Sequence, residues 1–239
     1  MSSERQRGLL LGLCLLAALD AQAGVTAERT RVIFNEGQRE ASLLLVNQNA
    51  YPVIVQTWID DGNLDTAPET AQAPIMPLPP VFRLNPEQQR SLRLLYTGQA
   101  LPKDRESLYW LNLYEIPPKS REPLAEGQSR LTVTLRTQMK VIYRPAALQA
   151  DAEGAPARLR FSSVAGELRV ENPTPYFITL ASVDVPQGQR HTIVQGELLE
   201  PFARRTLTFA QPVPEGKTLI HYQWIDDGGN AQAGESTLR

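Results

Sequence analysis

Strand-length apolar runs recur along this chain at intervals of about ten residues, a spacing typical of antiparallel β-sandwiches. Asn, Asp, Gly or Pro separates each run from the next. No long segment has the 3.6-residue periodicity of an amphipathic helix, and the 19 prolines, which are excluded from helix interiors, outnumber the 15 glycines. The sequence therefore predicts an all-β protein rather than one built from βαβ units.

The apolar runs form two groups on either side of a segment with few large apolar residues. The first group predicts roughly seven strands and includes the runs 29–34, 41–46, 51–59, 91–96, 108–116 and the unusually long 131–143. Residues 144–156 then have the composition of a linker or crossover. The second group predicts a smaller sandwich of about 85 residues and includes the runs 158–161, 167–170, 177–183, 206–209 and 219–225. We expect domains over residues 24–147 and 148–239.

Composition excludes several classes of protein. The chain carries 24 Lys and Arg against 26 Asp and Glu, a net charge of −2, which is too balanced for a surface that binds nucleic acid through phosphates. One cysteine forms no intramolecular disulfide, and the two histidines, His191 and His221, are too few for a common zinc site. We expect no nucleic-acid partner, no disulfide scaffold and no classical zinc fold.

The N-terminus has the order of a secretory signal peptide. Arg5 and Arg7 precede an uncharged apolar run, and the small residues Ala21 and Ala23 follow it. The run is about 12 residues long, short of the roughly 20 that span a bilayer as a helix. We therefore predict cleavage after Ala23, export to a bacterial periplasm and no stable membrane insertion. The lone thiol, Cys14, would leave with this segment.

Candidate catalytic and metal-binding motifs are weak. Asp61, Asn63 and Asp65 alternate as in a calcium loop, but Thr66 stands where such a loop needs glycine and Gln72 where it needs glutamate. A turn is the better interpretation, since Asx-Gly pairs favour turns. No nucleophile elbow, Gly-rich phosphate loop or paired-histidine metal motif is found. We expect no enzyme, no cofactor and no metal.

Several motifs resemble those of periplasmic pilus assembly chaperones of the chaperone–usher pathway, the PapD-like family. The strongest joins Arg-Glu-Ser at 105–107, a hydrophobic stretch, Asn112 and Ile-Pro-Pro at 116–118. Four others occur in the family's order, at residues 29–34, 79–86, 140–145 and 172–176. The resemblance implies a boomerang of two immunoglobulin-like domains that binds, folds and caps pilus subunits and delivers them to an outer-membrane usher.

The resemblance also implies a donor strand at about residues 131–143, lent to an incomplete subunit. Leu131, Val133 and Leu135 alternate with polar residues, so their side chains share one strand face. Arg31 and Lys140 correspond to the family's two cations that anchor the subunit's C-terminal carboxylate. Lys140 has the opposite parity to the three aliphatics, so either a bulge intervenes or the anchor and donor faces lie on different sides of the strand.

Glu106, Arg144 and an aspartate near residue 227 resemble the family's interdomain ion-pair network. Asp227 is the expected member and Asp226 the alternative, because the string here lacks the tyrosine usual in the family.

Two other functions fit fold and export alone. One is a secreted β-sandwich adhesin or carbohydrate-binding module, and the other is a periplasmic hydrolase, which lacks a motif.

Overall fold

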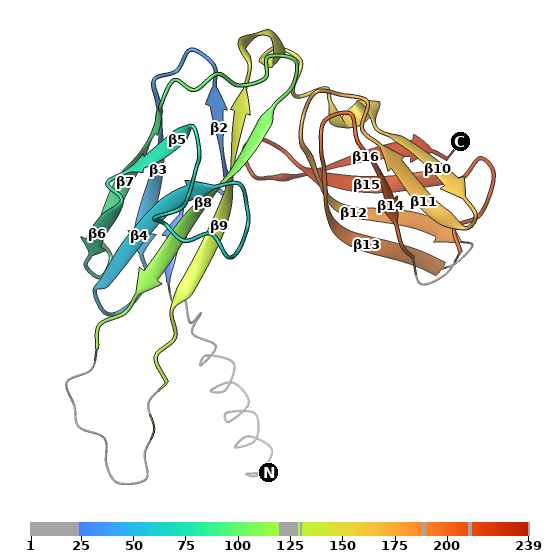
Figure 1. Cartoon of the computed structure of the whole chain (residues 1–239). Helices are drawn as coiled ribbons and strands as arrows, with labels where there is room; N and C mark the ends of the chain where they lie inside the picture. The colour runs from blue at the N-terminus through green and yellow to red at the C-terminus, as the bar shows by residue number, and fades with distance from the viewer. Residues whose placement is uncertain (1–23, 120–128, 130, 188–189, 210–211, 239) are drawn as a thin grey trace, which may run out of the picture.

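The computed structural model describes residues 24–119, 129, 131–187, 190–209 and 212–238. These residues form two β-rich lobes that meet at an angle (Figure 1). Residues 1–23, interpreted above as a signal peptide, lie outside the described residues. Within the described part, no helix is long and apolar enough to cross a membrane.

The first lobe is a sandwich of two sheets. One sheet has the order β1-β3-β7-β5 and consists of β1 (Val25–Ala27), β3 (Glu40–Asn47), β7 (Gln89–Tyr96) and β5 (Ile75–Leu78). The other has the order β2-β9-β8-β4-β6 and consists of β2 (Arg31–Asn35), β9 (Leu135–Arg144), β8 (Ser107–Ile116), β4 (Val53–Asp60) and β6 (Val81–Leu84).

Period-two alternation builds the core of this lobe. In β7, Leu92 and Leu94 are fully buried on either side of the exposed Arg93, and in β3, Leu43 and Leu45 are fully buried on either side of the half-buried Leu44. Strands of the facing sheet contribute their own inward residues to one continuous cluster, which includes Phe34, Val55, Leu84, Leu111, Leu113 and Val141. Each inner face is therefore apolar while the outer faces are free to carry polar side chains.

The second lobe is a smaller sandwich with its own core. A three-stranded sheet has the order β10-β11-β14, with β10 at Arg160–Val164, β11 at Glu167–Glu171 and β14 at Arg204–Leu207. A four-stranded sheet has the order β13-β12-β15-β16, with β13 at Arg190–Leu199, β12 at Ile178–Gln187, β15 at Leu219–Ile225 and β16 at Ala231–Thr237. Short 3-10 helices at Ala146–Leu148 and Pro156–Arg158 lie in the expected linker.

The prediction of an all-β chain with two sandwiches is confirmed, but the expected strand count is wrong. The first lobe has nine strands among the described residues, not roughly seven. The strands absent from the prediction in the two lobes are β1, β5, β6, β13 and β16, and each lies at the end of its sheet. An edge strand has one neighbour and needs less apolar alternation, so its sequence signal is weaker.

Candidate functional site

β9 is the strand on which the predicted site residues meet, and its two halves have different neighbours. β9 pairs antiparallel with β8 from Tyr143, opposite Ser107, to Leu135, opposite Glu115. β2 pairs with β9 only over residues 140–144. Among the described strands, residues 135–139 therefore have a neighbour on one side alone (Figure 1). This half of β9 is an open sheet edge.

The expected long strand at 131–143 is wrong at its start, because β9 begins at Leu135. β8 ends one residue beyond Glu115, the partner of Leu135, so earlier residues have no strand of this chain to pair with. Leu131 is 86% exposed, Val133 59% and Leu135 48%. The three predicted donor aliphatics are therefore open to solvent instead of packed in the core of the first lobe.

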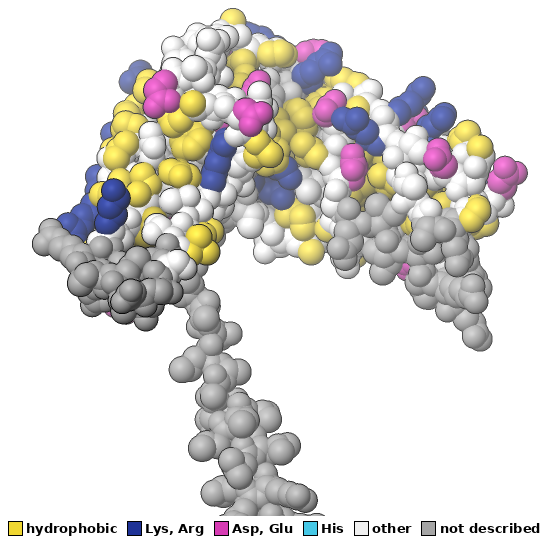
Figure 2. All heavy atoms as spheres, turned by 60° about the horizontal axis from the view of Figure 1, so that its bottom comes forward, with side chains coloured by type: hydrophobic (Ala, Val, Ile, Leu, Met, Phe, Trp, Pro, Cys, Tyr) yellow, Lys and Arg dark blue, Asp and Glu magenta, His cyan; other side chains and the backbone are white. Residues whose placement is uncertain are grey.

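Arg31 and Lys140 lie side by side where β2 joins β9. Arg31 Nη1 donates to the carbonyl oxygen of Ile225 at 3.1 Å, and Lys140 Nζ donates to Thr179 Oγ1 at 3.2 Å. Lys140 Nζ also lies 5.6 Å from the ring centroid of Trp110. Both acceptors belong to the second lobe, so the two cations lie in the cleft between the lobes. Figure 2 shows Lys and Arg side chains on the inner side of this bend.

The electrostatics of the two cations favour an anion in the cleft. Burial lowers the pKa of Arg31, while the carboxylates of Asp227 and Asp226 act in the opposite direction. Burial also lowers the pKa of Lys140, and the adjacent charge of Arg31 lowers it further. Arg31 Nε is buried and has no hydrogen-bond partner among the described residues. A bound carboxylate would relieve the repulsion between the two cations.

Arg144, the last residue of β9, joins the lobes through two carboxylates. Its Nε donates to Glu106 Oε1 at 2.6 Å, and its Nη1 and Nη2 donate to the two carboxylate oxygens of Asp227 at 2.6 and 3.0 Å. Glu106 also accepts a 2.7 Å hydrogen bond from the backbone N–H of Phe177. The expected trio of Glu106, Arg144 and Asp227 is therefore brought together across the lobes.

Burial and charge act against each other in this network. Burial raises the pKa of Glu106, and the guanidinium of Arg144 opposes that rise. For Arg144, burial acts to lower the pKa, but its hydrogen bonds with Asp227 and the charge of Glu106 raise it overall. Glu106 is 2% exposed, so its charge depends on Arg144 for compensation.

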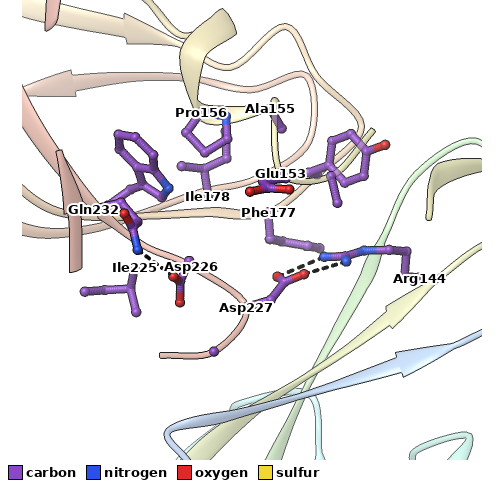
Figure 3. Close-up of a pocket in the computed structure, with 14 residues that line it drawn as sticks. Arg144, Glu153, Ala155, Pro156, Phe177, Ile178, Ile225, Asp226, Asp227 and Gln232 are labelled. Carbon is purple, nitrogen blue, oxygen red and sulfur yellow. Dashed lines mark hydrogen bonds and ion pairs between the residues drawn. The ribbon is translucent and has the colours of Figure 1, made fainter. Parts of the chain in front are cut away.

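The alternative aspartate, Asp226, belongs to its own turn. Its carboxylate accepts from the backbone N–H of Asn230 and the side-chain amide of Gln232, both at 2.8 Å. Figure 3 shows Asp227 facing Arg144 while Asp226 pairs with Gln232. A cavity of about 500 Å³ lies beside this junction, and Tyr176 of the second lobe contributes to its wall.

Two family matches decide the class of this protein. Residues 24–149 match the N-terminal domain of PapD, described as a pili and flagellar-assembly chaperone. Residues 154–236 match the C-terminal domain of the pili assembly chaperone PapD. The chain belongs to the PapD-like family of pilus-assembly chaperones.

Relatives of this chaperone cover nearly its whole length. It is 35% identical over 226 residues to the chaperone protein FimB/FhaD of Bordetella pertussis, with 92% of this chain and 91% of the relative covered. The crystal structure of the Pseudomonas aeruginosa CupB2 chaperone superposes with a TM-score of 0.77 at 32% identity, covering 90% of this chain and 100% of that one. The Salmonella enterica SafB chaperone, solved in complex with the SafA pilin, gives 0.76 at 32% identity, covering 91% and 97%. The prediction of a pilus chaperone of the chaperone–usher pathway is confirmed.

The structure distinguishes the two explanations for the position of Lys140, a bulge in the strand or two different strand faces. β9 keeps an unbroken register with β8 from Leu135 to Tyr143, so no bulge separates the two sets. Leu135 shares its face with the buried Met139 and Val141, whereas Lys140 lies on the opposite face. Lys140 and Leu135 therefore project from opposite faces of β9, and Arg31 lies beside Lys140 on the neighbouring strand β2.

The weak metal motif is a turn in the chaperone. The backbone N–H of Asn63 donates to Asp61 Oδ1, and the backbone N–H of Asp65 donates to Asn63 Oδ1. Across the described residues, no group of three or more His, Cys, Asp or Glu could hold a metal ion. His221 faces Glu235 at 3.3 Å on an exposed surface, and the side chain of His191 lies outside the described residues.

Three contributors to the cleft escaped the sequence reasoning. Thr179 and the carbonyl of Ile225 contact the anchor cations from the second lobe, and Trp110 lies beneath Lys140. Trp110 lies inside the strongest family motif, directly before Leu111 of the core. This position in the motif is the only sequence signal that points to Trp110. Nothing in the apolar run 177–183 distinguishes Thr179, because its role arises only when the two lobes meet.

Proposed function

We propose that this chaperone caps incomplete immunoglobulin-like pilins by donor-strand complementation. The observation that carries the proposal is the start of β9, where an open sheet edge adjoins three exposed aliphatics, Leu131, Val133 and Leu135. In β-augmentation, main-chain hydrogen bonds join the partner's strands while alternate side chains fill its groove, as in chaperone–pilin complexes. The SafB relative, solved with the SafA pilin, supports a pilin as the partner.

The aliphatic side chains are sufficient to contribute useful affinity. Three of them, at about 1.5–3 kcal/mol each, give roughly 5–9 kcal/mol before costs. Ordering residues 131–134 and losing translational freedom then subtract from this sum. Backbone pairing along the open edge adds to it, and no catalytic group is required.

The subunit's C-terminal carboxylate would bind between Arg31 and Lys140. A guanidinium can hold a carboxylate through two hydrogen bonds, while an ammonium acts as a compact charge. Because the cations lie at the end of the open edge, next to residue 139, one subunit could reach both features with a single extended strand.

The chaperone would then deliver its capped subunits to an outer-membrane usher. Export fits this route, and we propose that residues 1–23 are removed after Ala23 in the periplasm. Mass measurement of the purified periplasmic protein should give a chain that begins at Gly24. A mass that retains residues 1–23 would contradict the cleavage.

Co-expression with the pilin of the same gene cluster tests the proposal. Arg31→Ala and Lys140→Ala should each abolish the soluble chaperone–pilin complex recovered from the periplasm, since each removes one of the two anchor cations. The matched control is Arg93→Ala, which removes an exposed ion pair with Glu40 on the other sheet. This control should yield as much complex as the wild type.

Loss of complex is evidence for the anchor role only if the free variants stay folded, and thermal unfolding of each purified variant measures this. Undiminished complex with both anchor variants would overturn the carboxylate role. A wild-type protein that captures no pilin but binds glycans would instead favour an adhesin.

A further inference from the structure

The outer face of β9 carries polar side chains that each have a partner on the rest of the first lobe or in the cleft. These side chains form a polar stripe that consists of Thr134, Arg136, Gln138 and Lys140. Tyr114 donates through its hydroxyl to Thr134 Oγ1 at 3.1 Å. The stripe therefore begins one residue before β9, in the predicted donor segment.

Arg136 makes the most contacts in the stripe. Its Nε donates to Asn112 Oδ1 at 2.8 Å, its Nη1 to the carbonyl oxygen of Leu64 at 2.5 Å and its Nη2 to Asp60 Oδ2 at 3.4 Å. The guanidinium also lies over the ring of Trp58, 4.8 Å from the centroid. All three guanidinium nitrogens are thus used at the first outward position of β9.

Asn112 and Asp60 are the buried base of this arrangement. Asn112 is fully buried, and its Oδ1 accepts from both Arg136 and Gln138, the latter at 3.0 Å. Its Nδ2 donates to Asp60 Oδ2 at 2.8 Å. Asp60, 1% exposed, also accepts from Trp58 Nε1 and from the backbone N–H of Gly62. A buried carboxylate with this many donors and one cation holds a fixed geometry.

The open half of β9 needs such support because it has one strand neighbour. Residues 140–143 are held by β8 and β2, whereas residues 135–139 pair with β8 alone. A strand held on one side is easily twisted or frayed. The polar stripe supplies side-chain contacts where the second strand is missing, and it lies on the face opposite to Leu135, which remains 48% exposed.

We propose that Arg136, held by Asn112 and Asp60, is a positioning residue that fixes the start of the donor strand before a subunit arrives. This inference rests on the proposed function, since it assigns the network to pilin capture. Preorganisation reduces the ordering cost of binding, so loss of Arg136 should weaken capture in addition to the stability lost when the buried Asp60 is left without its cation.

Amide hydrogen exchange and pilin affinity together test the role of Arg136. In Arg136→Ala, amides of residues 135–139 that pair with β8 should exchange about tenfold faster or more, because hydrogen bonds of a charged group are lost. Amides of residues 140–144 should be unchanged. Affinity for the pilin of the same gene cluster should fall by about tenfold or more.

Two further variants separate positioning from general stability. Arg136→Lys keeps the charge but loses the planar set of donors, so it should restore capture only in part. Gln138→Ala removes a single contact to Asn112 and should show a smaller effect of the same kind. Arg93→Ala, on the other sheet, should leave both measurements at wild-type values.

The outcomes distinguish this inference from the proposed function. Wild-type exchange at residues 135–139 and wild-type capture in both Arg136→Ala and Gln138→Ala would overturn the positioning role while capping stands. If Arg136→Ala fails to fold, the exchange and capture of Gln138→Ala decide the question. Absence of capture by the wild-type protein would refute capping itself, and the exchange data would still test whether the stripe orders β9.

Discussion

The two halves of β9 belong to one strand but are built for different tasks. Residues 140–143 have strands on both sides, and the buried side chains of this half are Val141, Ile142, Tyr143 and Arg144, the last of which pairs with β2 alone. Residues 135–139 have one strand neighbour, and the segment before them is exposed. The first half of the strand is incomplete within this chain, whereas the second half joins the lobes.

This difference shows how one strand can offer an unpaired edge without losing its shape. The C-terminal half is fixed by core packing and by Arg144, which reaches Glu106 and Asp227. The N-terminal half is fixed from its polar side and left open along its edge. A fixed strand can pair with a partner at a lower entropic cost than a disordered one.

The largest expected effect comes from breaking the fixed half at Arg144. Arg144→Ala leaves the buried Glu106 without its cation, and the loss of one partner of a buried ion pair costs about 3–5 kcal/mol. Urea unfolding followed by tryptophan fluorescence should show this loss. Arg93→Ala, whose ion pair is exposed, should cost at most about 1 kcal/mol. Equal losses in the two variants would contradict the importance of the interdomain network.

A charge in the exposed segment that precedes β9 should weaken pilin capture strongly and change the stability of the free chaperone little. Val133 is 59% exposed, so Val133→Asp should change the free energy of unfolding by no more than about 0.5 kcal/mol. Burying the new carboxylate in an apolar groove should weaken pilin capture at least about a hundredfold. Binding of purified pilin measures this change.

The control for that variant is Val164→Asp, which places the same charge at an exposed valine of the second lobe. It should capture pilin as the wild type does. A Val133→Asp chaperone with normal affinity would show that this side chain does not enter the pilin.

A smaller effect is expected at the turn that approaches the fixed half from the second lobe. Gly229 has φ +88°, and a Cβ there would lie 2.7 Å from Thr30 Oγ1 of the first lobe. Gly229→Ala should therefore cost more than the roughly 1–2 kcal/mol of backbone strain that alanine incurs in this conformation. It should also weaken the contact between the lobes.

Gly216→Ala is the matched control, because Gly216 has φ +100° and nothing within 4 Å of a Cβ. The difference between the two unfolding free energies isolates the contact with Thr30. No difference would mean that the lobes move apart at this point at no cost.

The sequence was sufficient to predict two sandwiches because their central strands alternate strongly, as in Leu92 and Leu94 or Leu111 and Leu113. It failed at edge strands such as β5 and β16, where one neighbour suffices and Pro77 or Gly234 interrupts the pattern. Such residues are tolerated at an edge because less backbone pairing is lost there.

The site residues also divide into those that the sequence predicts and those that it does not. Arg31, Lys140, Glu106 and Arg144 could be chosen because motifs carried them, and the choice between Asp226 and Asp227 required the turn geometry. The contacts of Arg136 with Asn112 and Asp60 were not predictable, because they join three strands through side chains far apart in sequence. The sequence predicts the start of β9 too early, because apolar and polar residues continue to alternate where pairing with β8 stops.

Residue-resolved amide hydrogen exchange of β9, with and without pilin, tests the central claim most directly. In the free chaperone, amides of residues 135–139 that point away from β8 should exchange rapidly, while those of residues 140–143 are protected by both neighbours. Binding of pilin should protect the first group and leave the second unchanged. Protection of residues 135–139 equal to that of 140–144 before binding, or no gain on binding, would contradict an open edge that a subunit completes.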